Sequence, residues 1–429
     1  MTKFIFKMQQ LMILIFLFIV TVSNSQTVSS FVGGTQGFAD GNGNTARFRN
    51  PWGIAVDANG NLYVADAANN RIRKITPAGS VTTLAGGNIG FADGTGADAL
   101  FRYPTGVAVD NIGNVFVADM QNNAIRKITQ NGTVTTIAGG TFGNTDGIGN
   151  LAQFNAPYGI AIDNNGILYI ADRENSRIRK ITNESIVTTL AGSTIGFADG
   201  TGTQAQFWNP FAVAVDAFGN IIVGETHRIR KITSAGEVTT LAGSLNGGIG
   251  TTNGIASGAL FNTPTGFALS PTGEFYIADR GNHRIRKIDV NEIVSTFAGS
   301  TNGFGNGIGT AAQFYYPNGI VLAPDGNFYV TDAANDCVRK IAVQLNNNEY
   351  NELDSISLYP NPITDQIHLE LNNLDANKFI VYDINGREIQ SENIYKKITI
   401  INVSSYLQGI YFIKIISEKG FFFRKIMKQ

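Results

Sequence analysis

Apolar residues along most of the chain stand in short runs that are separated by turn-forming residues. Runs of this length, rich in β-branched and aromatic side chains and bounded by Asn, Gly and Pro, are typical of β-strands. In the first stretch with this pattern a "DANG" turn joins two runs and a "PAG" turn joins the next two, as in β-hairpins. The four predicted strands of this stretch are residues 53–57, 61–66, 71–76 and 81–85.

The same four-strand pattern returns along the chain. The stretch "NPWGIAVDANGNLYVADAANNRIRKITPAGSVTTLAGG" at 50–87 reappears as "YPTGVAVDNIGNVFVADMQNNAIRKITQNGTVTTIAGG" at 103–140. Units of four antiparallel strands at a fixed period are typical of β-propeller blades. The prolines that open the units lie 53 or 54 residues apart and predict six blades: Pro51, Pro104, Pro157, Pro210, Pro264 and Pro317.

The two ends of the repeat region complement each other. The sixth unit stops at "CVRKIA", residues 337–342, without a fourth strand. The segment "VSSFVGG" at 28–34 matches "VTTLAGG" at 81–87, the fourth strand of the first unit. We therefore expect the N-terminal segment to pair into the last blade and to close the ring, which removes the exposed strand edges.

The repeats resemble NHL repeats. The resemblance depends on motifs such as "PWGIAVD", "LYVAD" and "NNRIRKI", and it covers residues 28–342. It implies a six-bladed β-propeller for residues 26–342. It does not fix the activity, because one fold carries many functions.

The N-terminal residues 1–25 have the pattern of a Sec signal peptide. Lys3 and Lys7 give a positive first region, and the apolar run "LMILIFLFIVTV" covers 11–22. The small residues "SNS" at 23–25 follow, as at a cleavage site. Twelve apolar residues are too few to span a bilayer, so we expect cleavage rather than anchoring, and no later stretch is apolar enough to cross a membrane.

After a polar linker at 343–354, residues 355–429 show a different pattern. Alternation in "ISLYP", "QIHLEL" and "YFIKI" predicts a small antiparallel, Ig-like β-sandwich. This segment resembles the type A C-terminal sorting domain of the type IX secretion system of Bacteroidetes, through "LYPNP", "GIYFIKI" and the ending "KIMKQ". The signal residues that the resemblance implies are Tyr359, Pro360, Asn361, Pro362, Gly409, Tyr411, Lys425, Lys428 and Gln429.

The resemblance to the sorting domain implies a route and a partner. The protein would pass through the periplasm, engage the type IX secretion machinery and become secreted or attached to the outer-membrane surface. In this family the domain is commonly cleaved during export. The chain itself leaves open whether the product is released or anchored.

Composition excludes some partners and bonds. The formal net charge is −1, and 15% of the residues are charged. A nearly neutral chain lacks the basic surface that a nucleic-acid partner requires. Cys337 is the single cysteine, so no intrachain disulfide can form, and we expect a packed thiol rather than a nucleophile there.

Charged residues recur with the blades. An arginine recurs in all six units, and a carboxylate recurs at the end of each second strand. A ring of charge for an anion or metal is one interpretation. We favour one structural ion pair per blade, because an active site needs one or two such residues rather than six. The residues are Arg73, Arg126, Arg179, Arg230, Arg286 and Arg339, with Asp66, Asp119, Asp172, Glu225, Asp279 and Asp332.

The crossover loops carry another recurring acid. Asp40, Asp93, Asp146 and Asp199 precede a glycine in "GFADGTG"-like loops, which invites a calcium interpretation. The loops lack the ligand count and the terminal Glu of an EF-hand. We therefore expect no cofactor and no metal site, with calcium as the alternative. The phenylalanine that follows in each loop is expected to lie between blades.

The variation of the loops predicts the position of the binding surface. The loops between second and third strands and the crossovers lie on one face of the disc and vary, as binding loops on rigid scaffolds do. On this crossover face the residues before the inner-strand glycine should rim the channel: Trp52, Thr105, Tyr158, Phe211, Thr265 and Asn318. Its aromatic residues would stack a sugar or grip a peptide, or else pack on neighbouring loops. The ligand-binding candidates are Trp52, Tyr158, Phe211, Arg173, Glu174 and Arg280.

Two function classes remain. Six-bladed relatives include lyases and lactonases that use a metal or a His base, and the candidates here are Glu225, His227 and His283. Two histidines are too few for a three-His zinc site, and no nucleophile motif stands in the chain. We favour a non-catalytic recognition scaffold for a glycan, peptide or protein ligand. The alternative is an extracellular lyase- or lactonase-type enzyme with a site at the channel mouth.

Overall fold

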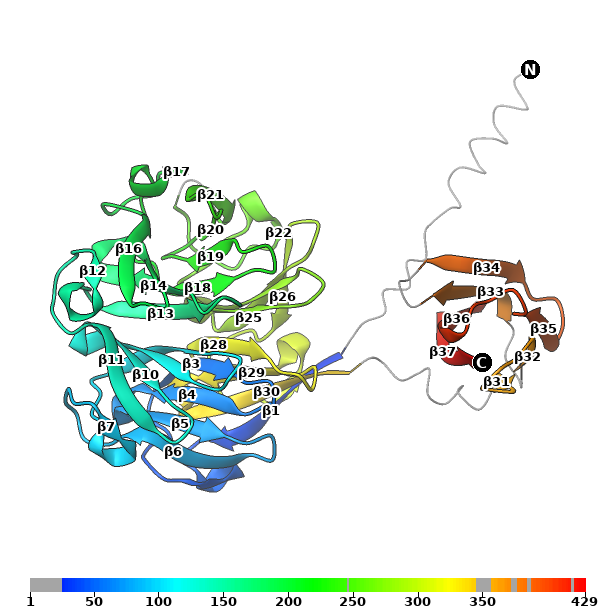
Figure 1. Cartoon of the computed structure of the whole chain (residues 1–429), viewed down its shortest axis with the longest axis horizontal. Helices are drawn as coiled ribbons and strands as arrows, with labels where there is room; N and C mark the ends of the chain where they lie inside the picture. The colour runs from blue at the N-terminus through cyan, green and yellow to red at the C-terminus, as the bar shows by residue number, and fades with distance from the viewer. Residues whose placement is uncertain (1–24, 245–246, 345–355, 372–375, 384–386, 418–419) are drawn as a thin grey trace, which may run out of the picture. The chain divides into compact units, whose positions relative to one another are not determined.

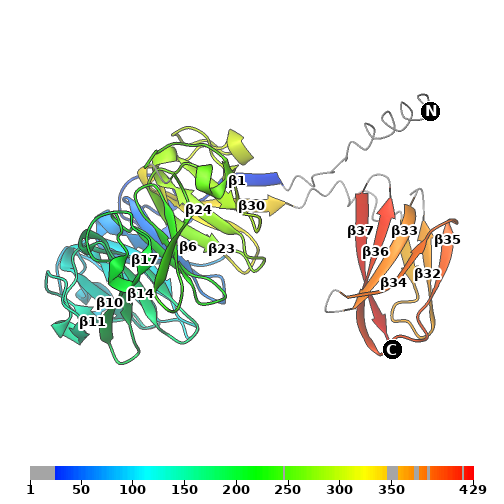
Figure 2. The ribbon, with the colours of Figure 1, turned by 90° about the horizontal axis from the view of Figure 1, so that it is seen from above.

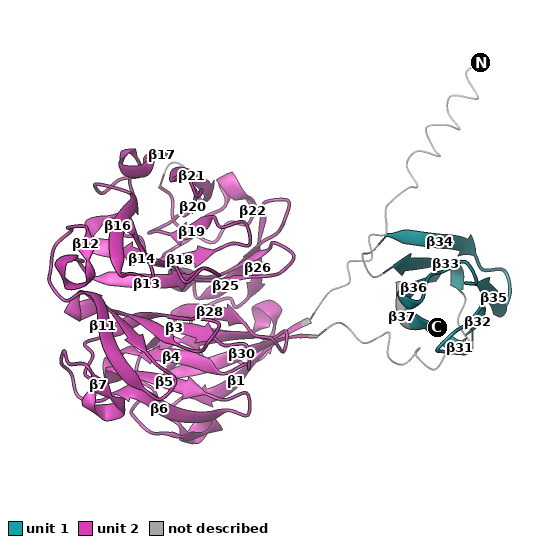
Figure 3. Ribbon diagram, viewed as in Figure 1, with its two compact units in different colours: residues 1–24, 344–429 teal, residues 25–343 magenta. Residues whose placement is uncertain are grey.

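The computed structural model describes residues 25–244, 247–344, 356–371, 376–383, 387–417 and 420–429. The chain divides into two compact units, one of which is Ser25–Val343 (Figures 1 and 3). The other contains Gln344–Gln429. The expected signal peptide at 1–25 and linker at 343–354 lie almost entirely outside the described residues, so both remain predictions.

The larger unit consists of six antiparallel sheets, one for each predicted repeat (Figures 1 and 2). Blade one has β3 (Pro51–Val56), β4 (Leu62–Asp66), β5 (Arg71–Ile75) and β6 (Ser80–Gly86). Blade two has β8 (Pro104–Val109), β9 (Val115–Asp119), β10 (Ala124–Ile128) and β11 (Thr133–Gly139). Blade three has β13 (Pro157–Ile162), β14 (Leu168–Asp172), β15 (Arg177–Ile181) and β16 (Ile186–Ala191).

The second half of the ring repeats this arrangement. Blade four has β18 (Ala212–Val215), β19 (Ile221–Gly224), β20 (Ile229–Ile232) and β21 (Glu237–Ala242). Blade five has β23 (Pro264–Leu269), β24 (Phe275–Asp279), β25 (Arg284–Ile288) and β26 (Ile293–Ala298). Blade six has β28 (Pro317–Leu322), β29 (Phe328–Asp332), β30 (Cys337–Gln344) and the N-terminal β1 (Ser25–Gly33).

The predicted closure of the ring is confirmed. Strand β1 lies between β30 and β27 in the sheet of blade six, so the first strand of the chain completes the last blade. Residue Thr27 pairs with Ile308, and Val28 pairs with Gly307. This closure leaves no blade with a missing fourth strand.

Each blade also carries a fifth, two-residue outer strand that the apolar pattern did not predict. It comes from the crossover loop before the blade and pairs with the blade's fourth strand, as Gly41 pairs with Val81. Its glycine-rich sequence has no apolar alternation, which explains why it was missed. The outer strands are β2 (Gly41–Asn42), β7 (Gly94–Thr95), β12 (Gly147–Ile148), β17 (Gly200–Thr201), β22 (Gly254–Ile255) and β27 (Gly307–Ile308).

Short 3₁₀ turns follow these outer strands and most second strands. Those in the crossover loops are η1 (Gly43–Thr45), η3 (Gly96–Asp98), η5 (Gly149–Leu151), η7 (Gly202–Gln204), η8 (Ala256–Gly258) and η10 (Gly309–Ala311). Those after second strands are η2 (Ala67–Asn69), η4 (Met120–Asn122), η6 (Arg173–Asn175), η9 (Arg280–Asn282) and η11 (Ala333–Asn335). Among the described residues no helix has the length and apolarity needed to span a bilayer.

The recurring arginine forms the structural ion pair that the repeats predicted. In blade two, Arg126 and Asp119 are fully buried and lie 2.8 Å apart (Nη1 to Oδ2). The same guanidinium donates to the backbone oxygens of Leu100 and Ala92 and to the crossover-loop Asp93. A single side chain thus fixes the second strand and the incoming crossover loop. Equivalent pairs at 2.8 to 3.0 Å occur in all six blades.

The crossover phenylalanines lie between blades, as expected. Phe48 is fully buried and packs in one cluster with Val64 of blade one and Val338 of blade six. The guanidinium of Arg73 lies 5.0 Å from the Phe48 ring centroid. Each blade interface is therefore filled by an aromatic ring that also contacts the buried arginine of the following blade.

The smaller unit is the predicted β-sandwich. One sheet has the order β31–β32–β35 and the other β34–β33–β36–β37. The strands of the second sheet are seen side by side in Figure 2. The seven strands are β31 (Ile356–Tyr359), β32 (Gln366–Leu371), β33 (Ala376–Asp383), β34 (Glu388–Asn393), β35 (Ile398–Asn402), β36 (Gly409–Ser417) and β37 (Gly420–Lys428).

The buried ion pair makes a stability prediction. Replacing Arg126 by Met leaves the buried Asp119 carboxylate without its counter-charge, which should lower the free energy of unfolding by about 3–5 kcal/mol. The exposed Arg102→Met variant, a matched control in the same blade, should change it by less than about 0.5 kcal/mol. Chemical denaturation of both variants measures the difference, and equal losses would contradict the role assigned to Arg126.

Candidate functional site

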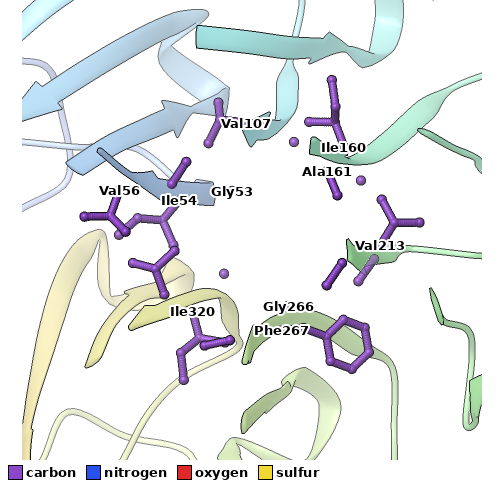
Figure 4. A pocket seen from close by; sticks show the side chains of 18 of the residues that line it. Gly53, Ile54, Val56, Val107, Ile160, Ala161, Val213, Gly266, Phe267 and Ile320 are labelled. Carbon is purple, nitrogen blue, oxygen red and sulfur yellow. The ribbon is translucent and has the colours of Figure 1, made fainter. Parts of the chain in front are cut away.

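The central channel is walled by the first strands of the six blades. Figure 4 shows the cavity, about 420 Å³ in volume, with the side chains of Val107, Ile160, Val213 and Ile320 turned into it. Thr265 supplies the one polar side chain in this described lining, and its Oγ1 donates to the backbone oxygen of Asn318 (3.0 Å). The channel wall therefore offers no side chain for proton transfer or metal binding.

The inner strands meet most closely at the crossover-face end of the channel. A Cβ atom added to Gly53 would lie 2.4 Å from the backbone oxygen of Thr105 in the next blade. Glycine at this place therefore lets neighbouring inner strands touch through their backbones. The residues just before these glycines are thereby brought together around a small recess of about 30 Å³.

Three aromatic rim residues close this end of the channel by packing on one another. Trp52 and Tyr158 have ring centroids 5.0 Å apart at 84°, and Tyr158 and Phe211 are 5.4 Å apart at 80°. Edge-to-face contacts of this kind are favourable beyond the area that they bury. Tyr158 is only 7% exposed, and burial raises the pKa of its hydroxyl, which therefore stays protonated. These three residues line the recess at the channel mouth, and their role in ligand binding stays a prediction.

Two arginines lie over this aromatic cluster. The guanidinium carbon of Arg173 lies 4.8 Å from the Phe211 centroid and 5.6 Å from that of Tyr158. Arg280 approaches from blade five, 5.1 Å from Trp52 and 4.6 Å from Tyr316. Cations over ring faces are attracted by the ring quadrupole. The faces of Trp52 and Phe211 are thus occupied by guanidinium groups.

The remaining ligand candidate, Glu174, lies beside one of these arginines. Its Oε1 atom is 3.1 Å from Nη1 of Arg173, and its side chain is 45% exposed. All six ligand candidates therefore belong to the crossover face, and five of them meet at the channel mouth or directly above it. The sequence analysis did not identify Tyr316, whose ring also lies against the guanidinium group of Arg280.

Glu225 stands where the other blades have aspartate. It is fully buried, accepts a hydrogen bond from the backbone N of Trp208 (2.8 Å) and pairs with Arg230 (3.0 Å). The loop that follows is two residues shorter in blade four, and the extra methylene of glutamate keeps the carboxylate within reach of the arginine. Burial raises the pKa of Glu225, and Arg230 opposes that shift.

His227 packs inside a small aromatic cluster in blade four. Its ring centroid lies 4.9 Å from Phe197 and 6.0 Å from Trp208, and the residue is 3% exposed. Desolvation lowers the pKa of His227, with a smaller contribution from Arg228. The side chain is therefore neutral near pH 7.

His283 links blade five to blade six. Its Nδ1 atom accepts a hydrogen bond from the backbone N of Tyr316 (3.2 Å). Asn70 and Asn123 make the same contact at the preceding junctions, to Tyr103 and Ala156. Because the same hydrogen bond recurs at several junctions, it is a structural link between blades. The sequence analysis did not predict this role for His283.

The recurring acids do not form a metal site in the part of the chain that the structure describes. No group of three or more His, Cys, Asp or Glu side chains there is arranged to hold a metal ion. The loop acid Asp40 binds Arg73 and the Thr83 hydroxyl instead. Cys337 is buried, and burial raises the pKa of its thiol.

The blocks that predicted a sorting domain lie together in the sandwich. The backbone N of Ile363, next to "LYPNP", donates to the oxygen of Met427 (2.8 Å), and Asn361 Oδ1 accepts from the Met427 N. Strand β36, with Gly409 and Tyr411, pairs along its whole length with β37. The three sorting motifs, which are separate in the sequence, are thus hydrogen-bonded to one another in the folded sandwich.

Family models agree with both resemblances. The NHL repeat model matches residues 48–75, 154–181, 261–288 and 314–341. The model for the secretion system C-terminal sorting domain matches residues 357–429. The chain is an NHL-repeat β-propeller with a secretion system C-terminal sorting domain. The sorting domain indicates secretion across the outer membrane, to the surface or the medium.

Curated relatives match part of the chain. The chloroplastic protein SUPPRESSOR OF QUENCHING 1 of Arabidopsis thaliana is 30% identical over 283 residues, covering 60% of this chain and 27% of that protein. Human NHL repeat-containing protein 2 is 28% identical over 319 residues, covering 63% of this chain and 43% of that protein. The NHL chain thus spans less than half the length of these relatives.

Solved structures from Bacteroides share the fold. A structural genomics protein of unknown function from Bacteroides thetaiotaomicron aligns with a TM-score of 0.59 and 22% identity, over 75% of this chain and 77% of that chain. An auxiliary nutrient binding protein from the same organism aligns with a TM-score of 0.59 and 18% identity over the same shares. These similarities establish the architecture of the NHL propeller.

The link through His283 predicts a pH dependence. Desolvation, Arg280 and Arg284 lower the pKa of His283 in the folded chain, so below pH 6.5 the unfolded chain takes up a proton that the folded chain does not. The free energy of unfolding should therefore fall as the pH falls. His283→Asn, which copies Asn70, should keep the hydrogen bond and reduce that fall when melting is followed from pH 7.5 to 5. His368→Asn, in the sandwich, should leave the melting of the propeller unchanged at each pH, and an identical pH dependence in all three proteins would refute the assignment.

The meeting of the sorting motifs predicts an export defect. Deleting residues 425–429 removes Ile426, which is 1% exposed in the sandwich core, and the partners of Ile363. In a host with a type IX system the truncated chain should accumulate in the periplasm, as cell fractionation with immunoblotting would show. Tyr395→Ala, at a residue that is 85% exposed, should be exported normally. Normal export of the truncated chain would contradict the role of the ending.

Proposed function

We propose that the NHL propeller is a non-catalytic recognition module, exported by the type IX system, that binds a glycan, peptide or protein ligand at the channel mouth of its crossover face. The observation that carries this proposal is the pair of arginines, Arg173 and Arg280, lying over a closed aromatic cluster on the variable face. Loops of varied sequence on a rigid scaffold are where binding residues concentrate. Charged and aromatic groups gathered at one mouth are suited to holding a ligand.

The contacts of the catalytic candidates also favour binding over catalysis. Glu225 is engaged by Arg230, His283 is engaged by Tyr316, and His227 is enclosed by aromatic rings. General acid–base catalysis requires such groups to reach a substrate proton together. The lyase- or lactonase-type alternative would need these three side chains to leave their structural contacts and converge.

The fold of Bacteroides neighbours is compatible with this function. Two of the solved structures are described as auxiliary nutrient binding proteins, from Bacteroides thetaiotaomicron and Bacteroides ovatus. The comparison supports the idea that a propeller with this fold can serve in binding. The identity of the ligand has to come from the mouth itself.

The proposal is tested by binding arrays. The full-length chain, labelled at a surface lysine, is applied to glycan and peptide arrays next to an Arg173→Ala/Arg280→Ala variant. We expect the hits of the parent chain to weaken at least about tenfold in the variant, because charge-assisted contacts are lost. A Lys74→Ala/Lys127→Ala variant removes two charges from third strands near the opposite face and should bind normally. Hits that survive the arginine changes and disappear in the lysine variant would place the ligand elsewhere and refute the proposal.

A further inference from the structure

The recess at the channel mouth contains polar groups that no protein atom satisfies. Asn318 is 1% exposed, and neither its Oδ1 nor its Nδ2 has a hydrogen-bond partner among the described residues. The indole Nε1 of Trp52 is equally buried and unpartnered within the same part of the structure. Both residues line the 30 Å³ recess, which is large enough for about one water-sized group. Buried polar groups are rarely left unsatisfied, so the recess is suited to an exogenous oxygen.

The charge around the recess is positive. Arg280 lies over Trp52, and its Nε is buried without a partner among the described residues. Arg173 lies over Phe211 on the other side, and its Nε is also buried without a partner among the described residues. Tyr158 lies between them, and the charges of both arginines act on its hydroxyl. Among the described residues the site therefore holds four unsatisfied donor atoms against a single unsatisfied acceptor, the Asn318 oxygen.

A surplus of donors next to two guanidinium groups selects an oxyanion. Guanidinium groups bind carboxylates in charge-assisted, often bidentate hydrogen bonds. A neutral ligand would leave the positive charge of Arg280 uncompensated, whereas Arg173 already pairs with Glu174. The chemistry of the mouth is thus that of a carboxylate-binding site with additional donors for nearby ligand oxygens.

The surroundings favour a saccharide over a peptide as the carrier of the carboxylate. Peptides are commonly bound by adding a strand to a sheet edge or by inserting apolar side chains into pockets. Here the outer edge of each blade is a two-residue strand, and the aromatic faces at the mouth are covered by Arg173 and Arg280. A sugar ring instead surrounds its carboxylate with hydroxyl oxygens that the remaining donors can bind.

We propose that the channel mouth binds an acidic saccharide, with the carboxylate of a uronic acid held by Arg280 and Arg173 and with Asn318 and Trp52 donating to the single ligand oxygen that enters the recess. This inference rests on the proposed recognition function and specifies its ligand class. Glu174, 3.1 Å from Arg173, competes with the carboxylate for that guanidinium. Removing the charge of Glu174 therefore strengthens binding.

The test uses the full-length chain and three defined probes: hexagalacturonate, the neutral hexasaccharide maltohexaose, and hexaglutamate. Binding is measured by calorimetry and by tryptophan fluorescence, to which Trp52 contributes. We expect hexagalacturonate to bind at least about tenfold more tightly than either other probe. Its affinity should fall as salt rises, because charge pairs that water reaches are screened.

Variants assign the interaction to the mouth. Arg280→Gln should weaken hexagalacturonate binding at least about tenfold, and Glu174→Gln should tighten it several-fold. Arg71→Gln is the matched control, because Arg71 also lies over an aromatic ring (Phe38, 3.8 Å) but begins the third strand of its blade. Melting temperatures confirm that each variant is folded, and Arg280→Lys, which keeps the charge, should lose less affinity than Arg280→Gln.

The outcomes separate this inference from the recognition function. Equal binding of maltohexaose, sensitive to Arg280→Gln, would overturn the acidic specificity while recognition at the mouth stands. Preference for hexaglutamate would replace the saccharide by an acidic peptide. Binding that ignores Arg280 and Glu174, or no binding of hexagalacturonate at all, would refute the inference, and the arrays would then decide on recognition itself.

Discussion

One buried arginine per blade is the interaction on which the propeller depends. In blade one the Arg73 guanidinium joins the carboxylate that ends the second strand, the acid of the crossover loop and the backbone oxygens of Arg47 and Ala39. Burying a charge is costly unless its hydrogen bonds and its counter-charge are supplied in place. The crossover loop is therefore held to its blade, and the loops of the crossover face become a fixed frame for the residues that differ between blades.

The division between repeated and varied positions explains where function can reside. Repeated acids, such as Glu225 and Asp40, form ion pairs with the buried arginines. His283 makes the hydrogen bond that recurs at the junctions between blades. The rim positions are less constrained: Thr105 and Thr265 donate to the backbone of the next blade, while Trp52, Tyr158 and Phe211 are aromatic residues that pack on one another. Six nearly equal blades can therefore present one unequal mouth, in which no other rim position carries an asparagine or a tryptophan.

Much of the fold could be read from the sequence because the blade repeats. Strand order, closure by residues 28–34 and the ion pairs followed from comparing units. The outer strands such as Gly41–Asn42 were missed, since two glycine-rich residues carry no apolar period. The mouth could be located but not described. Trp52 could have faced a ligand, but it packs on Tyr158. This contact joins residues that are far apart in the chain, so no local sequence pattern predicts it.

The closing strand has a consequence for how the protein forms. Strands β1 and β30 are the first and the last strand of the propeller and pair with each other, so the ring cannot be completed until almost all of it has been made. Contacts of such high sequence separation form late, because a long loop must first be closed. Until then β30 presents a free edge, the kind of surface that aggregates or is degraded. Because the sorting domain follows β30 in the sequence, a chain that stops before β30 lacks both the partner strand of β1 and the sorting domain.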